Sequence, residues 1–125
     1  MLPPRLFISL GALNCLLSVA LGAFGAHMLE GRLTADLFAI YQKASLYHMP
    51  HGLGLILVGM LGLHKDSRLI RASGWLLLIG ILLFCGSLYT LGLTGIRSLG
   101  IITPFGGTAF LAGWLCLCIA AWRLR

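Results

Sequence analysis

Residues 72–96 read ASGWLLLIGILLFCGSLYTLGLTGI and contain no Asp, Glu, Lys or Arg. A helix needs about 20 apolar residues to cross a hydrocarbon layer roughly 30 Å thick. No face of this stretch is strongly polar, as one face of a helix lying on a membrane surface would be. The stretch therefore predicts a transmembrane helix.

Three other stretches have the same character, and they are Leu6–Leu29, Ala44–His64 and Ser98–Trp122. Arg97 alone separates the last of them from residues 72–96, but Thr94 and Gly95 beside it are typical of a turn. We expect an all-α membrane protein, a single domain over residues 1–125. Its fold would be an antiparallel bundle of four transmembrane helices, at about 6–27, 44–63, 72–93 and 103–122.

The composition supports a membrane protein. The chain is 59% hydrophobic and 10% charged, with a mean hydropathy of +1.00, whereas soluble domains are about 25% charged. So apolar a chain is not intrinsically disordered. The net charge is +6, but the basic residues mostly flank apolar runs. That placement indicates membrane topology, so we expect membrane lipids as partners and no nucleic acid.

The positive charges predict the orientation. Six Lys or Arg would lie on the side of the two termini, namely Arg5, Lys65, Arg68, Arg71, Arg123 and Arg125, against three on the other side, Arg32, Lys43 and Arg97. Both termini are therefore expected in the cytoplasm. We expect the first apolar run to be a retained helix, because it is longer than the core of a signal peptide and no small-x-small site ends it.

The segment 30–43 between the first two helices is more polar. Leu33, Leu37, Ile40 and Tyr41 recur at helical spacing among charged residues. This pattern predicts a short amphipathic helix on the outer surface, or one continuous with the second span.

Small residues inside the spans favour close helix packing. Ser18, Gly22 and Ala26 recur every four residues, and Ala109 and Gly113 repeat that spacing. Such residues let helix backbones approach within a membrane, in one bundle or between copies of a homo-oligomer. The four cysteines have no CxxC spacing and are expected to be packing residues rather than a disulfide framework or zinc site: Cys15, Cys85, Cys116 and Cys118.

Antiparallel threading would gather the polar residues at one level, near the outer helix ends. The first helix ends at His27, and the second has Tyr47, His48 and His51 near its start. The third contains Ser87, Tyr89 and Thr90, and the fourth begins with Thr103 and Pro104. Tyr47 and His51 share a helix face. Pro50 would either kink the second helix beside the cluster or mark where that helix begins.

Several interpretations of this cluster remain open. It could be a hydrogen-bonded clasp that holds the helices together, or a pocket for a lipid headgroup, quinone or other amphiphile. A metal site would use His27, His48 and His51, but no carboxylate lies in the four spans. Haem has only histidine as a possible ligand. A channel or transporter would require an oligomer. No catalytic motif is present, so we expect no catalytic residue and no cofactor.

Four motifs carry a family resemblance: GAFGAH at 22–27, Tyr47 with His51, GSLY at 86–89 and TPFGG at 103–107. In them the chain resembles the YgdD/YwdK-like family of small integral inner-membrane proteins, a domain of unknown function. The resemblance implies four transmembrane helices in the bacterial inner membrane and supplies no activity. It also implies glutamine at the position of His48, which weakens the metal interpretation.

The motifs and the depth argument select the same candidate ligand-binding residues: His27, Tyr47, His51, Ser87, Tyr89, Thr103, Pro104, Gly106 and Gly107. We expect a non-enzymatic module that binds a lipid-like small molecule or a partner membrane protein through them. The alternatives are a metal- or quinone-binding redox or enzyme subunit and a small-solute channel or transporter formed by an oligomer.

Overall fold

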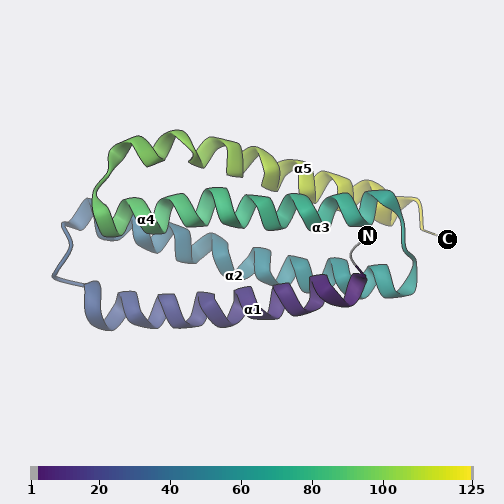
Figure 1. Cartoon of the computed structure of the whole chain (residues 1–125), viewed down its shortest axis with the longest axis horizontal. Helices are drawn as coiled ribbons and strands as arrows, with labels where there is room; N and C mark the ends of the chain where they lie inside the picture. Colours follow the sequence, from purple (N-terminus) through teal and green to yellow (C-terminus); the bar gives the residue numbers. More distant parts are fainter. Residues whose placement is uncertain (1–2, 125) are drawn as a thin grey trace.

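The computed structural model describes residues 3–124, and helices are the only regular elements among them (Figure 1). Four helical segments are long and apolar enough to cross a membrane: Pro4–Leu29, Ala35–His64, Arg68–Thr94 and Arg97–Trp122. They run antiparallel, side by side. The predicted all-α bundle of four membrane-spanning helices is confirmed.

The segments divide into five α-helices and three tighter or wider turns. Helix α1 is Pro4–Phe24, extended by a π-helical turn at Gly25–Leu29, and α2 is Ala35–His64. The third span consists of α3 at Arg68–Gly80, a π-helical turn at Ile81–Cys85 and α4 at Gly86–Thr94. A 3₁₀ turn at Arg97–Ile101 precedes α5 at Thr103–Trp122.

Local chemistry explains where the third span begins and ends. Ser67 is the N-cap of α3, and its hydroxyl oxygen accepts a hydrogen bond from the Ile70 amide at 3.2 Å. Gly95 ends α4 in the left-handed conformation, at φ 74°, which glycine adopts without steric cost. The span is therefore slightly longer than the predicted 72–93, whereas α5 matches the predicted 103–122.

The second span differs most from its prediction, because α2 begins at Ala35 and not near residue 44. Tyr41 is only 1% exposed, and its ring packs against Gly25 of the first span. Residues 35–43 are thus the first turns of α2, held within the bundle rather than lying separately on the surface. At 1.5 Å per residue, these turns add about 13 Å of helix before residue 44.

Helix α2 and the third span form the centre of the bundle. Helix α1 packs along α2, and α5 packs along α3, so α1 and α5 lie at opposite edges in Figure 1. The backbones approach closely at glycines. A Cβ atom added to Gly11 would lie 2.6 Å from the Gly52 carbonyl oxygen, so α1 can lie this close to α2 only with glycine there.

The two ends of the bundle differ in charge. Both chain termini lie at the same end (Figure 1), which we call the basic end because five described Lys or Arg are near it: Arg5, Lys65, Arg68, Arg71 and Arg123. The buried side chains of this half are mostly aliphatic or aromatic, including Phe7, Val58, Ile70 and Leu77. Most of the polar side chains that the sequence singled out therefore lie further toward the other end.

Candidate functional site

A groove on the side of the bundle contains four of the nine predicted site residues. It has a volume of about 550 Å³ and is formed by α2, the π-helical turn of the third span and α5. We call it the aromatic groove, and its lining residues are Tyr47, His51, Phe84, Pro104, Gly107, Thr108, Phe110, Leu111 and Trp114. Leu111 is largely exposed, and Tyr47 is partly exposed. In a membrane the groove would therefore open toward the lipid.

His51 lies at the buried side of the groove, with both ring nitrogens in hydrogen bonds. The Trp114 indole donates to its Nε2 at 2.9 Å, and its Nδ1 lies 2.6 Å from the Tyr47 carbonyl oxygen. Because the indole only donates and the carbonyl only accepts, Nδ1 carries the proton and the ring is neutral. The Phe110 ring stacks on it, 3.6 Å away between ring centres. His51 therefore contacts both Trp114 and Phe110 on the α5 wall of the groove, and both of its ring nitrogens are in hydrogen bonds.

Tyr47 supplies the unpaired polar group of the groove. Its ring packs edge-on against Phe84, with ring centres 4.9 Å apart, and 41% of the residue is exposed. Its hydroxyl has no hydrogen-bond partner among residues 3–124, whereas the Thr108 hydroxyl donates to the Pro104 carbonyl at 2.9 Å. A molecule in the groove would thus find mainly aromatic surface and one hydroxyl able to donate or accept.

Helix geometry places these side chains as the sequence predicts. Tyr47 and His51 share one face of α2, and their rings stack with centres 6.3 Å apart. Pro50 lies inside α2, which continues through it. Pro50 has no amide hydrogen, so the carbonyl of Leu46 lacks that hydrogen-bond partner. Pro50 therefore does not mark the start of the helix, which begins at Ala35.

A second, buried polar cluster connects three helices, and we call it the polar clasp: Asn14, His48 and Tyr89. The Asn14 side chain donates to the Leu10 carbonyl at 2.8 Å, and its Oδ1 lies 3.0 Å from His48 Nε2. His48 Nδ1 lies 3.0 Å from the Tyr89 hydroxyl. Because the Asn14 oxygen accepts, Nε2 of a neutral His48 donates and Nδ1 accepts from Tyr89. The clasp therefore ties α1, α2 and α4 together.

The remaining predicted residues have packing or linking contacts. The Ser87 and Thr103 hydroxyls are 2.6 Å apart, and Ser87 also donates to the Phe84 carbonyl at 3.0 Å, so Thr103 is the donor of the pair. This bond links α4 to the start of α5. Gly106 packs directly on the Phe84 backbone, whereas a Cβ atom at Gly107 would make only an ordinary van der Waals contact with the Phe84 ring.

His27 is not part of either cluster, so the structure contradicts a single polar layer. The packing of α1 on α2 shows how far apart His27 and His51 lie along the bundle. Gly52, next to His51, packs against Cys15 of α1, so His51 lies near the depth of Cys15. Gly25, near His27, packs instead against Tyr41. Cys15 and His27 are twelve positions apart, about 18 Å along a helix. The cause is the early start of α2, which places His51 near the middle of its helix instead of at its outer end.

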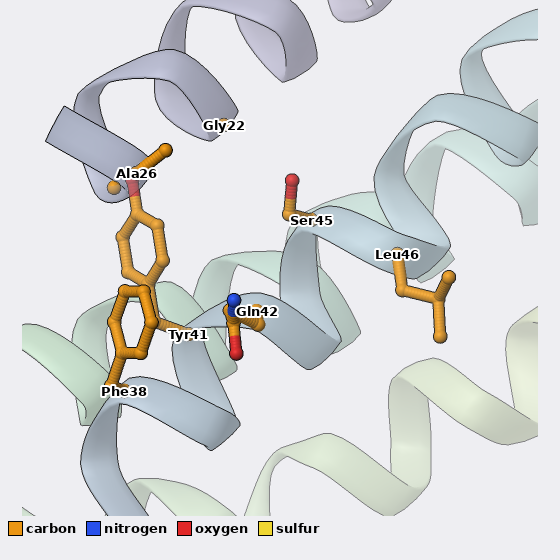
Figure 2. Close-up of a pocket in the computed structure, with 8 residues that line it drawn as sticks. Gly22, Ala26, Phe38, Tyr41, Gln42, Ser45 and Leu46 are labelled. Carbon is orange, nitrogen blue, oxygen red and sulfur yellow. The ribbon is translucent and has the colours of Figure 1, made fainter. Parts of the chain in front are cut away.

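A smaller pocket of about 260 Å³ lies nearer His27, between α1 and α2 (Figure 2). In Figure 2, Gly22 and Ala26 of the predicted small-residue stripe face Tyr41, Gln42 and Ser45 of α2. The Tyr41 hydroxyl is occupied, because it donates to the Leu21 carbonyl at 2.6 Å. His27 itself is exposed and does not line this pocket.

The three histidines proposed for a metal site are not brought together. No group of three or more His, Cys, Asp or Glu in the described residues could hold a metal ion. His48 and His51 use their ring nitrogens in separate hydrogen-bonded clusters. The four cysteines are unbridged, and Cys85 is buried in the core.

The chain is similar to known membrane proteins over most of its length. Residues 21–107 match a family described as a protein of unknown function, DUF423. The chain belongs to this family. It is 51% identical over 116 residues to a UPF0382 membrane protein of Staphylococcus epidermidis, covering 93% of this chain and 94% of the relative. It is 47% identical over 119 residues to the UPF0382 membrane protein YwdK of Bacillus subtilis, covering 94% and 96%. No solved structure matches the chain.

This membership confirms the expected resemblance and a membrane protein of unestablished function. Sequence reasoning missed three aromatic residues of the groove, namely Phe84, Phe110 and Trp114. The i, i+4 spacing of Phe110 and Trp114 was the available signal, because it puts both on one face of α5. The sequence also did not predict the contact between Asn14 and His48, because only the packing of α1 on α2 sets the relative depth of these two residues.

Proposed function

We propose that this protein is a non-enzymatic membrane module that binds a lipid-like small molecule in the aromatic groove. The observation that supports the proposal best is the groove itself, about 550 Å³ in volume and lined mainly by aromatic and aliphatic groups. Small-molecule sites are typically about 300–1,000 Å³ and predominantly apolar, with a few polar groups that fix orientation.

The chemistry of the lining favours an amphiphile. Phe84, Phe110 and Leu111 offer apolar surface to an acyl or isoprenoid chain, and the Tyr47 hydroxyl offers one hydrogen bond to an ester, carbonyl or hydroxyl oxygen. His51 contributes indirectly, because its bond to the Trp114 indole holds one wall in place. Flat quinone headgroups fit the same aromatic surface as acyl chains, so identification of the bound molecule is part of the test.

The proposal includes a location. The relatives are bacterial and named membrane proteins, and the excess of Lys and Arg at the basic end favours a cytoplasmic location for both termini. The protein would then be a multi-pass protein of the bacterial cytoplasmic, or inner, membrane. Its groove would be reached sideways from the bilayer.

Two glycine substitutions give a matched test. An added Cβ at Gly107 meets nothing closer than the Phe84 ring at 3.8 Å, so Gly107→Leu fills the groove without pressing on backbone. A Cβ at Gly86 meets nothing within 4 Å, and Gly86 is outside the groove, so Gly86→Leu makes the same chemical change elsewhere. Both variants and the wild type would be purified in mild detergent, extracted with solvent and analysed by mass spectrometry.

The proposal expects a lipid or quinone that copurifies with wild type and Gly86→Leu but falls about tenfold in Gly107→Leu, the change that a loss of about 1.4 kcal/mol of binding produces. Tyr47→Phe should reduce it as well. Equal retention of every extracted molecule by all variants would reject the groove as a binding site.

A further inference from the structure

A separate cavity at the basic end combines positive charge with an apolar floor. It has a volume of about 200 Å³ and lies where the α2–α3 connection meets the end of α5. Its lining residues are Lys65, Ser67, Arg68, Leu69, Ala120, Arg123 and Leu124. No residue of the aromatic groove belongs to it. The cavity is therefore a second and independent candidate site.

Three cationic side chains line this small cavity from two parts of the chain. Lys65 and Arg68 flank the start of α3, and Arg123 follows α5. None of the three forms an ion pair with another described residue, whereas neighbouring Arg71 pairs with Asp66. The chain has three acidic side chains, and the other two, Glu30 and Asp36, lie at the opposite end of the bundle. Asp66 is thus paired with Arg71, and no acidic side chain of the described residues forms an ion pair with Lys65, Arg68 or Arg123.

Apart from Ser67, whose hydroxyl caps α3, the rest of the lining is apolar. Leu69 and Leu124 are partly buried, and Ala120 is 4% exposed. Trp122, beside the cavity in sequence, is 90% exposed, as expected of a tryptophan at the membrane–water boundary. An anionic group held by the three cations would thus have aliphatic surface next to it. This combination matches a phosphodiester headgroup followed by its glycerol and acyl chains.

We infer that Lys65, Arg68 and Arg123 form a binding site for an anionic phosphate group, supplied by an anionic phospholipid such as phosphatidylglycerol. Basic pockets between transmembrane helices on the cytoplasmic side recognise such headgroups. Arginine suits phosphate particularly well, because its guanidinium can donate two parallel hydrogen bonds. The inference does not depend on the aromatic groove.

The test measures lipid binding to the full-length protein in nanodiscs or by native mass spectrometry. Phosphatidylglycerol is titrated against phosphatidylcholine, with wild type compared with the double variant R68Q/R123Q. The single variants R68Q and R123Q are compared with the control Arg5→Gln, because Arg5 lies at the same end of the bundle, loses one charge as each of them does and does not line the cavity. R68K/R123K tests whether charge alone suffices. Melting temperatures of all variants verify folding.

We expect selective retention of phosphatidylglycerol by wild type and Arg5→Gln. Its binding should weaken about twenty-five-fold in R68Q/R123Q, since each Lys or Arg near an anionic lipid contributes about a factor of five. R68K/R123K should bind more tightly than R68Q/R123Q and less tightly than wild type, because lysine keeps the charge but not the two parallel hydrogen bonds of arginine. Competition by millimolar inorganic phosphate would support the anion site but make a free phosphate its ligand. An equal loss in Arg5→Gln, or no preference over phosphatidylcholine in wild type, would overturn the inference.

Discussion

His48 is the residue on which the buried polar contacts of three helices meet. It donates from Nε2 to Asn14 of α1 and accepts at Nδ1 from Tyr89 of α4, each at 3.0 Å. Its own exposure is 4%. Where water cannot reach, an unpaired polar group costs more than its bond contributes. The value of His48 therefore lies in offering a donor and an acceptor on opposite sides of one ring.

This chemistry makes a prediction about two substitutions at one position. Glutamine also offers a donor and an acceptor, so His48→Gln should retain nearly all the stability. His48→Leu should lower the free energy of unfolding by about 1–3 kcal/mol, because Asn14 and Tyr89 lose their partner. Thermal or SDS unfolding in detergent micelles measures both. Equal stability of the two variants would mean that the clasp contributes no net stability.

A second prediction concerns the tautomer of His51. The Trp114 bond requires an unprotonated Nε2, so ¹⁵N spectra of histidine-labelled protein at neutral pH should show His51 with only Nδ1 protonated. In Trp114→Phe the donor is lost, and the Nε2 resonance should shift while the His48 resonances stay unchanged. A wild-type His51 protonated at Nε2 would contradict this arrangement of the groove wall.

At the scale of elements, two adjacent glycines have opposite roles at the start of α5. A Cβ at Gly106 would collide with the amide nitrogen and Cα of Phe84, whereas Gly107 has room. Gly106→Ala should therefore lower the free energy of unfolding by about 1–3 kcal/mol through overpacking. Gly107→Ala should raise it by up to about 1 kcal/mol, because alanine is the better helix former. Unfolding in detergent provides the comparison, and losses of equal size would exclude close packing at Gly106 as the cause.

The helical spans were predictable because their limits follow from local chemistry. The absence of charged residues over 72–96 predicts a transmembrane span, and this prediction does not depend on how the other helices pack around it. The start of α2 was not predictable in the same way. Lys43 and Asp36 suggest a surface segment, but Tyr41 packs against Gly25 and Gly92 and holds these turns inside the bundle. The helical spacing of Leu33, Leu37, Ile40 and Tyr41 left open a surface helix or one continuous with the second span, and tertiary packing decided for the continuous helix.

The candidate site was predictable only within one helix. Tyr47 and His51 share a face because of their spacing, which holds in any fold. Their partners Phe84, Phe110 and Trp114 depend on how α5 and the third span are rotated toward α2. Apolar residues cover all faces of these spans, so periodicity does not specify the rotation. The predicted layer failed at His27 for the related reason that depth depends on where each helix begins.

The whole molecule is asymmetric along its long axis. The polar clasp and the Ser87–Thr103 bond together link all four spans, and both lie away from the basic end. In the half nearer the basic end, the fully buried Ser73 side chain donates to the Gly113 carbonyl at 2.8 Å. The excess of Lys and Arg at the basic end predicts that this end faces the cytoplasm.

That orientation gives the last prediction. His64 and Ser98 are exposed at opposite ends of the bundle, so His64→Cys and Ser98→Cys report on the two sides. Because positive loops stay in the cytoplasm, a membrane-impermeant maleimide added to intact cells or spheroplasts should label Ser98→Cys and leave His64→Cys unlabelled until the membrane is permeabilised. Wild type, whose four cysteines lie within the spans, sets the background. The reverse pattern would place the basic cavity on the outer side of the membrane and would show that the charge excess does not govern insertion of this bundle.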